Sequence, residues 1–458
     1  MRASHDLWAI SHPSSFTLHP SSFTFPPMDI IPQDGMKIDR DTRLARGVYY
    51  LPHGIEIVKD GVTLDGNGAL LIGEGFAGRG VVVNRHSGVN IRNLQVERYY
   101  HGIWVNASAN VRIERCHITR THEVAGPDVF LDIWLDHSQA YGAGIIFNGV
   151  IDSSICDNDL QHQQNGVMLY GCHKVEVVRN NASFNSGSGI LLFESSDNAI
   201  QSNIADFCCR IYNYRGRDGA AYHNGADAAA LVMMCNSSRN HISHNLLRSG
   251  GDGVFLGGFH KDQIKTPCND NIFEHNDGSW SPNIAFEATF SEHNIFRHNK
   301  ADNCNYGFWL GYSSHTTVAD NSIVGNRIAG VAIEQGHHNA IRHNTFARNR
   351  DGVQFWVGAR PAFTNFYPEC AESYETDIAD NEFTRHDSAI RIWTEREAAA
   401  LRCHNFRITG NTISDNRIAA QIERVRDSIV QNNRIKNNVE SGLMLIGCQD
   451  VQTMNNEM

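Results

Sequence analysis

The chain repeats one short pattern of apolar and polar positions almost from end to end. A small residue is followed by an apolar residue, any residue and a second apolar residue, as in HGIWVN from His101, DGVFLGG from Asp252 and SGLMLI from Ser441. A second element, N-x-I-x-x-N, follows most copies, and successive copies are 22 or 23 residues apart, as from Gly144 through Gly166 to Gly189. Apolar residues alternate with period two inside each copy, and no 3.6-residue period persists, so the pattern predicts strands and excludes helices.

This repeat length predicts an all-β chain, a right-handed single-stranded parallel β-helix. Three short strands close each coil into a triangle, and the next coil stacks about 4.8 Å further along the axis. Glycine fits the tight corner, and asparagine adopts the left-handed turn there. Asparagine side chains that stack in successive coils can also hydrogen-bond to one another as a ladder. We expect a solenoid of about 14–15 coils with an N-terminal cap.

The segments before the regular repeat differ in pattern. Residues 1–27 contain HPSSFTL followed at once by HPSSFTF, which looks like a translated non-coding repeat, so we interpret them as a disordered leader before a true start at Met28. Residues 28–80 are expected to form the cap and the first coil, and residues 81–458 the β-helix. No export signal and no run of 18 apolar residues is recognisable, which predicts a cytoplasmic protein that does not enter a membrane.

Insertions into the regular coil locate a candidate groove. Extra residues at about 121–142 and 207–225 come immediately before a copy of the first element, and those at about 260–268, 357–376 and 395–403 come immediately after one. Insertions in a solenoid map to loops on one face. The outward residues of the first strand in each coil are therefore expected to line the floor of a groove with walls on both sides.

The expected floor mixes aromatic rings with carboxylates, a combination that suits stacking against sugar rings. The loop that ends at Asp227 adds a high density of hydrogen-bond donors and resembles a substrate clamp. The candidate substrate-binding residues are Phe255, Tyr306, Trp309, Glu334, Trp356, Arg217, Tyr222, His223 and His260.

Three acidic residues are the candidate catalytic groups: Asp227, Asp252 and Glu287. Asp227 and Asp252, in GADAAALV and GGDGVFLG, are expected in the same register of adjacent coils, with their carboxylates within about 5 Å. Like charges so close raise one pKa, as a general acid of a glycosidase requires. Glu287 and Glu334 are expected in a second register, two coils or about 9.6 Å apart. The alternative interpretation is that the aspartates cap backbone amides in turns and that the glutamates are solvated.

Composition narrows the possible partners. A formal net charge of −11 disfavours nucleic acid, because phosphate binding needs clustered Lys and Arg. The 11 Cys include no CxxC motif and are interpreted as reduced thiols, and the 24 His show no convincing ligand spacing with a carboxylate. We therefore expect no metal and no cofactor. Lysine, which could serve as the base of a lyase, is scarce. The DPHD-like run that marks alginate epimerases does not appear either, so we expect a hydrolase rather than a lyase or an epimerase.

The elements DGVFLGG, NAIRHN and YGFWLGYS resemble the right-handed parallel β-helix repeat superfamily over about residues 60–458. That group includes glycoside hydrolases, pectate lyases, alginate epimerases and NosD-type periplasmic copper-binding proteins, and its repeat says little about the reaction. The resemblance implies the fold and, for the hydrolases, paired acids on a sheet face. Our leading interpretation is a glycoside hydrolase acting on a saccharide. A non-catalytic NosD-like binding protein stays open, although the absence of an export signal and of a Met/His/Cys cluster counts against copper.

Overall fold

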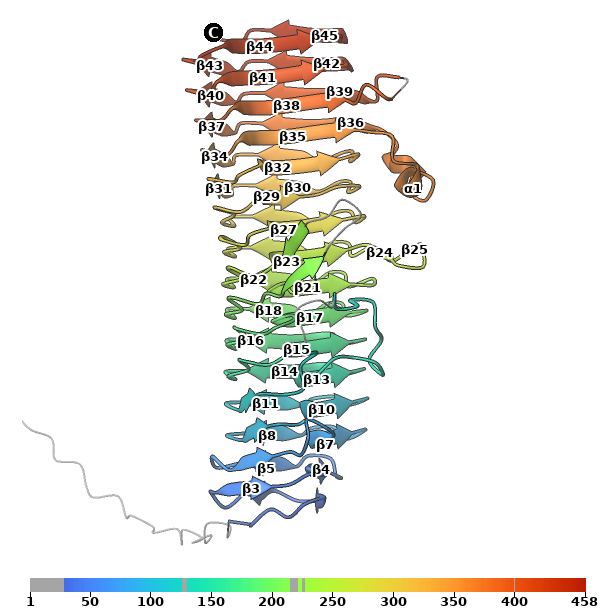
Figure 1. Cartoon of the computed structure of the whole chain (residues 1–458), viewed down its shortest axis with the longest axis vertical. Coiled ribbons are helices and arrows are strands. Elements are labelled where there is room, and N and C mark those ends of the chain that lie inside the picture. Colours follow the sequence, from blue (N-terminus) through green and yellow to red (C-terminus); the bar gives the residue numbers. More distant parts are fainter. Residues whose placement is uncertain (1–28, 126–129, 215–220, 225–226, 399) are drawn as a thin grey trace, which may run out of the picture.

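The computed structural model describes residues 29–125, 130–214, 221–224, 227–398 and 400–458. They form one continuous right-handed parallel β-helix, in which the coils stack along a single axis from the N-terminal end to the C-terminal end (Figure 1). Each coil contributes one strand to each of two long parallel sheets, and the third side of the triangle is less regular. The fold class predicted from the repeat is confirmed.

The first sheet contains one strand from every coil. In order along the axis, the described residues give it β1 (Met36–Ile38), β4 (Ile55–Ile57), β7 (Arg79–Asn84), β10 (His101–Asn106), β13 (Ala143–Asn148), β15 (Asn165–Tyr170), β17 (Ile190–Phe193), β21 (Leu231–Met234), β23 (Asp252–Gly257), β27 (Ile284–Thr289), β29 (Tyr306–Trp309), β32 (Ala329–Glu334), β35 (Asp351–Val357), β38 (Ser388–Thr394), β41 (Ile418–Glu423) and β44 (Ser441–Ile446).

The second sheet runs beside it with the same number of strands. It consists, within the described residues, of β2 (Thr42–Arg43), β5 (Thr63–Asp65), β8 (Asn90–Arg92), β11 (Arg112–Glu114), β14 (Ile151–Cys156), β16 (His173–Val178), β18 (Ala199–Gln201), β22 (His241–Ser243), β26 (Ile272–Glu274), β28 (Ile295–Arg297), β30 (Thr317–Ala319), β33 (Ala340–Arg342), β36 (Ser373–Ala379), β39 (Cys403–Thr409), β42 (Val425–Gln431) and β45 (Gln449–Met454).

The third side is formed by two shorter sheets, which isolated bridges connect. The N-terminal one contains β3 (Val48–Tyr50), β6 (Leu70–Ile72), β9 (Gln95–Glu97) and β12 (His117–Thr119). The C-terminal one contains β31 (Ser322–Val324), β34 (Thr345–Ala347), β37 (Glu382–Thr384), β40 (Thr412–Ser414) and β43 (Arg434–Lys436).

The segment 28–80 was expected to hold a cap and one coil, but its described part holds two complete coils, β1–β3 and β4–β6, and the start of β7. The first sheet therefore has 16 strands within the described residues, slightly more than the 14–15 coils expected. Both early coils carry the glycine-apolar element, as GMKI from Gly35 and GIEI from Gly54, but these copies are 19 residues apart instead of 22 or 23. The leader 1–27 lies outside the described residues. In the part of the chain that the structure describes, no helix is long and apolar enough to cross a membrane.

Alternate residues of each strand point into a narrow apolar core. Phe286 and Phe308 stack there with ring centroids 5.1 Å apart, and Phe273 and Phe296 stack at 4.6 Å. Identical positions of successive coils thus contact one another along the axis. This arrangement buries a continuous core although no single coil could bury its own apolar side chains.

Buried asparagines form the predicted ladder at one corner. The Nδ2 group of Asn180 donates to Oδ1 of Asn203 at 3.0 Å, and Asn203 donates in the same way to Asn245 at 3.0 Å. The same bond recurs from coil to coil along the axis. The members are Asn158, Asn180, Asn203, Asn245, Asn276, Asn299, Asn321, Asn344, Asn381, Asn411, Asn433 and Asn456.

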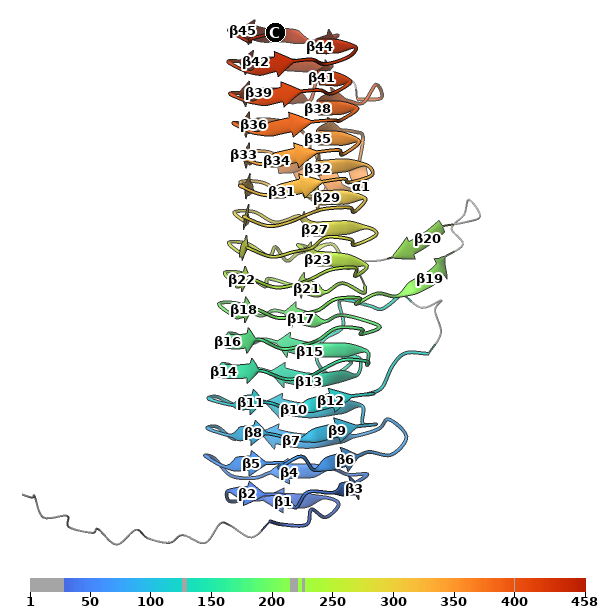
Figure 2. The same ribbon diagram turned by 90° about the vertical axis from the view of Figure 1, so that its left-hand side faces the viewer.

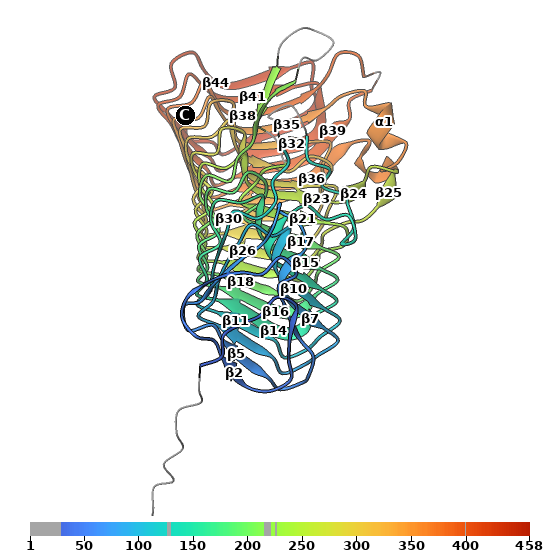
Figure 3. The ribbon, with the colours of Figure 1, turned by 60° about the horizontal axis from the view of Figure 1, so that its bottom comes forward.

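The insertions lie at the positions that the coil lengths predicted. The antiparallel hairpin of β19 (Ile211–Tyr214) and β20 (Ala221–Asn224) projects away from the stack (Figure 2). A second hairpin, β24 (Phe259–His260) with β25 (Ile264–Lys265), lies beside the segment of the helix α1 (Pro361–Thr364) and the 3₁₀ helix η1 (Pro368–Cys370), as Figure 3 shows. Both sides of the first sheet therefore carry insertions.

Candidate functional site

Two rows of side chains run along the outer face of the first sheet. In the first row Glu287 pairs with Phe255 of the preceding strand and Trp309 of the following one, and the row continues to Ala332, Gln354 and Arg391. In the second row Glu334 pairs with Trp356. Glu287 and Glu334 were expected in the same row, and this register is wrong. The sequence pattern predicted Asn283 as the small corner residue of this coil. The structure instead has Ala285 at the corner, opposite Gly253, so Glu287 lies two positions after the corner and not four.

The register expected for Asp227 is also wrong by two residues. Leu231 pairs with Val254, so the residue two places before Leu231, Ala229, lies opposite Asp252, and Asp227 precedes it by two. The run of three alanines at 228–230 offers several small residues for one corner, and the sequence cannot distinguish them. Asp227 therefore lies ahead of the strand, near Asp252 but not in its row.

Asp227 and Asp252 are nevertheless neighbours, and each caps a backbone amide with one oxygen. The amide of Leu131, in the first insertion, donates to Oδ2 of Asp227 at 2.9 Å. Oδ1 of Asp252 accepts from the Ile284 amide at 3.0 Å and from Nδ2 of Asn283 at 2.9 Å. Among the described residues the other oxygen of each carboxyl group is buried with no hydrogen-bond partner. Capping of a backbone amide therefore occupies one oxygen of each carboxyl group, and the other oxygen remains available as an acceptor.

Burial and mutual repulsion keep protons on this acid cluster, which we define as Asp227, Asp252 and Glu287. Burial raises the pKa of Asp227. Burial, with a further contribution from the charge of Asp227, raises the pKa of Asp252 to about 7 against the hydrogen bonds from Ile284 and Asn283. Burial first and then the charge of Asp252 raise the pKa of Glu287 well above its ordinary value. The cluster therefore holds at least part of its protons near neutral pH.

Exposure separates the three acids. Asp227 and Asp252 are 2% and 0% exposed, whereas Glu287 is partly exposed on the outer face of the sheet. Glu287 is therefore the member of the acid cluster that a ligand can contact directly, and the two aspartates lie behind it.

Aromatic rings continue the surface from Glu287 toward the C-terminus. Tyr306 and Trp309 meet edge to face with centroids 4.9 Å apart, and Trp309 meets Trp356 in the same way at 5.5 Å. Trp356 stacks on Trp393 at 5.4 Å. The strip suits stacking against sugar rings. Glu334 belongs to its edge, where Nε of Arg360 lies 2.9 Å from its carboxylate and Nε1 of Trp356 donates to it at 3.1 Å.

Toward the N-terminus the outer face is covered. Residues 130–142 of the first insertion pack Ile133 and Trp134 on the side chains of β13 to β23, in a second apolar cluster outside the β-helix core. Phe255 belongs to this cluster and is 9% exposed. The covered part of the outer face therefore reaches Phe255, which pairs with Glu287 of the next strand.

Three insertions join into one wall along this face. Nζ of Lys261 lies 2.6 Å from the carboxylate of Asp132, and Nε1 of Trp134 donates to the Phe259 carbonyl at 3.0 Å. The hairpin β24–β25 in turn contacts the 361–370 segment, where Lys265 lies 2.7 Å from Glu369. His260 lies within this wall, and its Nδ1 is 3.2 Å from Asp262.

The clamp residues of the 207–225 insertion are less fully placed. Arg217 lies outside the described residues. Tyr222 and His223 belong to β20, whose backbone pairs with β19, and their side chains lie outside the described part of the chain. Their proposed contact with a substrate stays a prediction.

A group of possible metal ligands lies at the corner between the first and second sheets. Glu292, His293 and His315 each offer a donor atom, and within the described residues these atoms all lie within 4.8 Å of one another. The expectation of no metal rested on spacing in the sequence, which does not reveal this group. His293 and His315 are separated by one coil, so stacking brings them together although their spacing in the sequence matches no metal motif.

Comparison with known proteins agrees with the architecture. The family model described as "Periplasmic copper-binding protein (NosD)" matches residues 54–264 and 219–398. The chain belongs to this NosD family. A second model, described as "Right handed beta helix region", matches residues 369–458 of this NosD-family chain. No protein with a curated description matches its sequence.

Several solved structures resemble this chain at low identity and with TM-scores below 0.5. The Azotobacter vinelandii mannuronan C-5 epimerase AlgE6 A-module is 12% identical, with 93% of this chain and 91% of that chain covered and a TM-score of 0.45. The periplasmic alginate epimerase AlgG is 11% identical, with 90% and 79% covered and a TM-score of 0.39. A GH87 alpha-1,3-glucanase from Streptomyces thermodiastaticus strain HF3-3 is 12% identical, with 86% and 64% covered and a TM-score of 0.38.

The donors of the corner group fit the metal in the family description. Imidazole nitrogens and a carboxylate are ligands that Cu²⁺ accepts, and copper binds such sites more tightly than the other divalent metals of its row. Glu292, partly exposed, and the exposed His293 and His315 are the residues of this NosD-family chain that would hold the ion.

Proposed function

We propose that this chain is a carbohydrate-active enzyme, a glycoside hydrolase that uses Glu287 as its proton donor. The observation that carries the proposal is the raised pKa of a partly exposed glutamate beside Asp252, on a sheet face that an aromatic strip continues. Solved structures of carbohydrate enzymes share only the fold, so the proposal depends on this acid cluster. A carboxyl group that keeps its proton near neutral pH is what a glycosidic oxygen needs as it leaves.

The proposed step is the hydrolysis of a glycosidic bond. The saccharide stacks on Trp309, and the carboxyl group of Glu287 gives its proton to the glycosidic oxygen as the bond to the anomeric carbon breaks. Water attacks that carbon and gives its proton back to the carboxylate of Glu287, the acid of this cluster that is partly exposed. Asp252, buried behind it, keeps the pKa of Glu287 high, and the charge of Asp227 acts in the same way on Asp252. The net reaction consumes one water and restores the carboxyl group of Glu287.

A saccharide panel tests this proposal. The purified protein is incubated with neutral and acidic oligosaccharides, and the products are separated by chromatography. Wild type is expected to release products from at least one of them, and Glu287→Gln to release none. Asp351→Asn is the matched control, because Asp351 starts a strand in the same way as Asp252 but its carboxylate is engaged by Gln354 and lies 3.9 Å from Arg391. A panel without products, or a Glu287→Gln variant as active as the control, would contradict it.

Metal binding is the second candidate function, and the corner group of Glu292, His293 and His315 favours it. A bound Cu²⁺ would be held by two imidazoles and one carboxylate. Titration with CuSO₄, followed by calorimetry and electron paramagnetic resonance, should show nitrogen ligation in wild type and its loss in His315→Ala. His298→Ala is the control, because His298 stacks on His275 at 5.0 Å in a similar column at a separate corner. Equal copper binding in all three proteins would exclude this site.

A further inference from the structure

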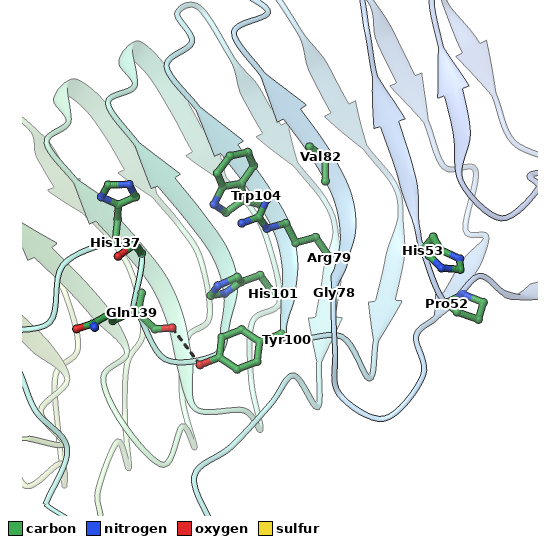
Figure 4. Close-up of a pocket in the computed structure, with 12 residues that line it drawn as sticks. Pro52, His53, Gly78, Arg79, Val82, Tyr100, His101, Trp104, His137 and Gln139 are labelled. Atoms are coloured by element: carbon green, nitrogen blue, oxygen red, sulfur yellow. Dashed lines mark hydrogen bonds between the residues drawn. The ribbon is translucent and has the colours of Figure 1, made fainter.

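A cavity of about 750 Å³ lies on the outer face of the first sheet, far from the acid cluster. Strands β7 and β10 form its floor, the segment 137–140 of the first insertion covers one side, and the turn at Pro52 and His53 closes the other (Figure 4). In the order of the sheet, β13, β15, β17 and β21 separate β10 from β23. Five strand spacings make about 24 Å between this cavity and Asp252.

The lining of this cavity is basic, although the whole chain is acidic. Arg79, His53, His101 and His137 line it, and its lining includes neither Asp nor Glu, whereas the chain has 50 acidic and 39 basic residues. Two acids lie next to the lining: Asp34, whose Oδ2 is 2.5 Å from Nδ1 of His53, and Asp136, which precedes His137 in the chain. No ion pair with Arg79 forms among the described residues. Arg79 therefore presents a positive charge in a lining without acidic side chains, although the whole chain carries a net negative charge.

Aromatic rings hold the cationic group in place. The guanidinium carbon of Arg79 lies 3.8 Å from the ring centroid of Trp104, and Figure 4 shows the two side chains side by side above the sheet. Tyr100 is fixed by a hydrogen bond from its hydroxyl to the Ala140 carbonyl at 3.1 Å, and its ring stacks on His122 at 4.7 Å. Such a stack orients the planar fork of an arginine for a bidentate contact with an anion.

His101 supplies a buried polar group without a partner. Its side chain is 7% exposed, and its Nδ1 atom is buried with no hydrogen-bond partner among the described residues. Burial, followed by the charge of Arg79, lowers the pKa of His101 to about 3, so the ring is neutral near pH 7. A neutral imidazole can donate to or accept from a hydroxyl group. Because Nδ1 itself is buried, a ligand in this cavity would contact the part of His101 that remains exposed.

We propose that this cavity binds an anionic sugar, with its charged group on Arg79 and its ring beside Trp104 and Tyr100. The neutral His101 contacts a sugar hydroxyl. The charged group is a carboxylate or a phosphate, both of which the arginine fork accepts. This site is separate from the acid cluster, because four strands lie between β10 and β23 in the sheet.

Calorimetric titration with D-glucuronate, D-glucose 6-phosphate and D-glucose tests this proposal. We expect one or both anionic sugars to bind and D-glucose to bind on the order of tenfold more weakly or not at all, because a charge-assisted hydrogen bond is lost. Arg79→Gln should weaken the anionic sugar on the order of tenfold. Arg85→Gln is the control, because Arg85 is an exposed arginine at the end of the same strand and does not line the cavity.

The results separate the sources of the anion. Glucuronate alone identifies a sugar acid, and glucose 6-phosphate alone identifies a sugar phosphate; either result supports the site. Binding of D-glucose as tight as that of the anions would overturn it, and so would equal loss in Arg79→Gln and Arg85→Gln. If inorganic phosphate binds as tightly as glucose 6-phosphate, the sugar ring adds nothing to binding, and the proposal of a sugar site is contradicted. Arg79 is exposed, so Arg79→Gln should keep the wild-type melting temperature, and a binding loss then reports on the site.

Discussion

The charge of Asp252 lies close enough to Glu287 to raise the pKa of the glutamate beyond the effect of burial. The two residues belong to neighbouring strands, β23 and β27, and come together because one coil stacks on the next. Glu287 is partly exposed and Asp252 is not. In this pair, the accessible acid is Glu287, and the charge of the buried acid Asp252 makes Glu287 harder to deprotonate.

Replacing Asp252 by Asn should lower the pKa of Glu287. The substitution removes the neighbouring charge and keeps the shape, so only the effect of burial remains. Isotope-edited NMR of the carboxyl carbons should show Glu287 titrating at lower pH in Asp252→Asn than in wild type. In enzyme assays the high-pH limit of activity, where Glu287 loses its proton, should move to lower pH. An unmoved titration, equal to that in Asp351→Asn, would show that the two groups do not interact.

The contribution of Asp252 to the stability of the protein should fall between about pH 4 and pH 7. The pKa of Asp252 is raised from 3.8 to about 7 in the folded chain, so the folded state binds a proton that the unfolded state releases over this interval. The part of the free energy of unfolding that depends on Asp252 therefore decreases as pH rises through this window and levels off above it. The lowered pKa of His101 acts in the opposite direction in both proteins, so the comparison is between them: across the window the melting temperature of wild type should decline relative to that of Asp252→Asn. A steeper decline in the variant would contradict the raised pKa.

Breaking the asparagine ladder should destabilise the stack. Asn276 donates to Asn299 and to the Ile242 carbonyl and accepts from Asn245, so Asn276→Ala leaves buried partners unpaired. We expect a loss of about 3 kcal/mol, seen as a lower denaturation midpoint in urea. Asn365→Ala, at an exposed position, is the control. Equal midpoints for the two variants would show that the ladder adds little stability.

Truncating Trp309 should weaken saccharide binding more than it slows the reaction. Its ring lies beside Glu287 in the first row and is partly exposed. Trp309→Ala is expected to raise KM about fivefold, with a smaller change in kcat, because ring stacking contributes about 1 kcal/mol. Trp280→Ala, which removes an exposed ring outside the two rows, should leave KM unchanged. A fall in kcat alone would place Trp309 in the chemistry instead.

The fold was predictable because every coil repeats the same pattern of apolar, glycine and asparagine positions. The alternating apolar residues, the corner glycines and the stacked asparagines each predict the same structure, and the ladder from Asn158 to Asn456 confirms them. Register was harder where the corner residue was ambiguous. The alanines before Leu231 and the sequence around Ala285 each displaced one acid by two residues.

The surroundings of the site were not predictable from the repeat. The coil lengths located the insertions, but they could not show that Ile133 and Trp134 would cover the sheet next to Phe255. Contacts between coils, such as that of His293 with His315, depend on stacking and not on spacing within one coil. The cytoplasmic location stays a prediction.

The role of Glu287 as proton donor is tested most directly with two substrates that differ only in the leaving group. One is the natural linkage that the saccharide panel identifies, and the other is an aryl glycoside of the same sugar, whose leaving group departs without a proton. Glu287→Gln should lose on the order of 10²-fold or more in kcat on the natural linkage and far less on the aryl glycoside. Equal losses on the two substrates, or no loss on either, would contradict the account.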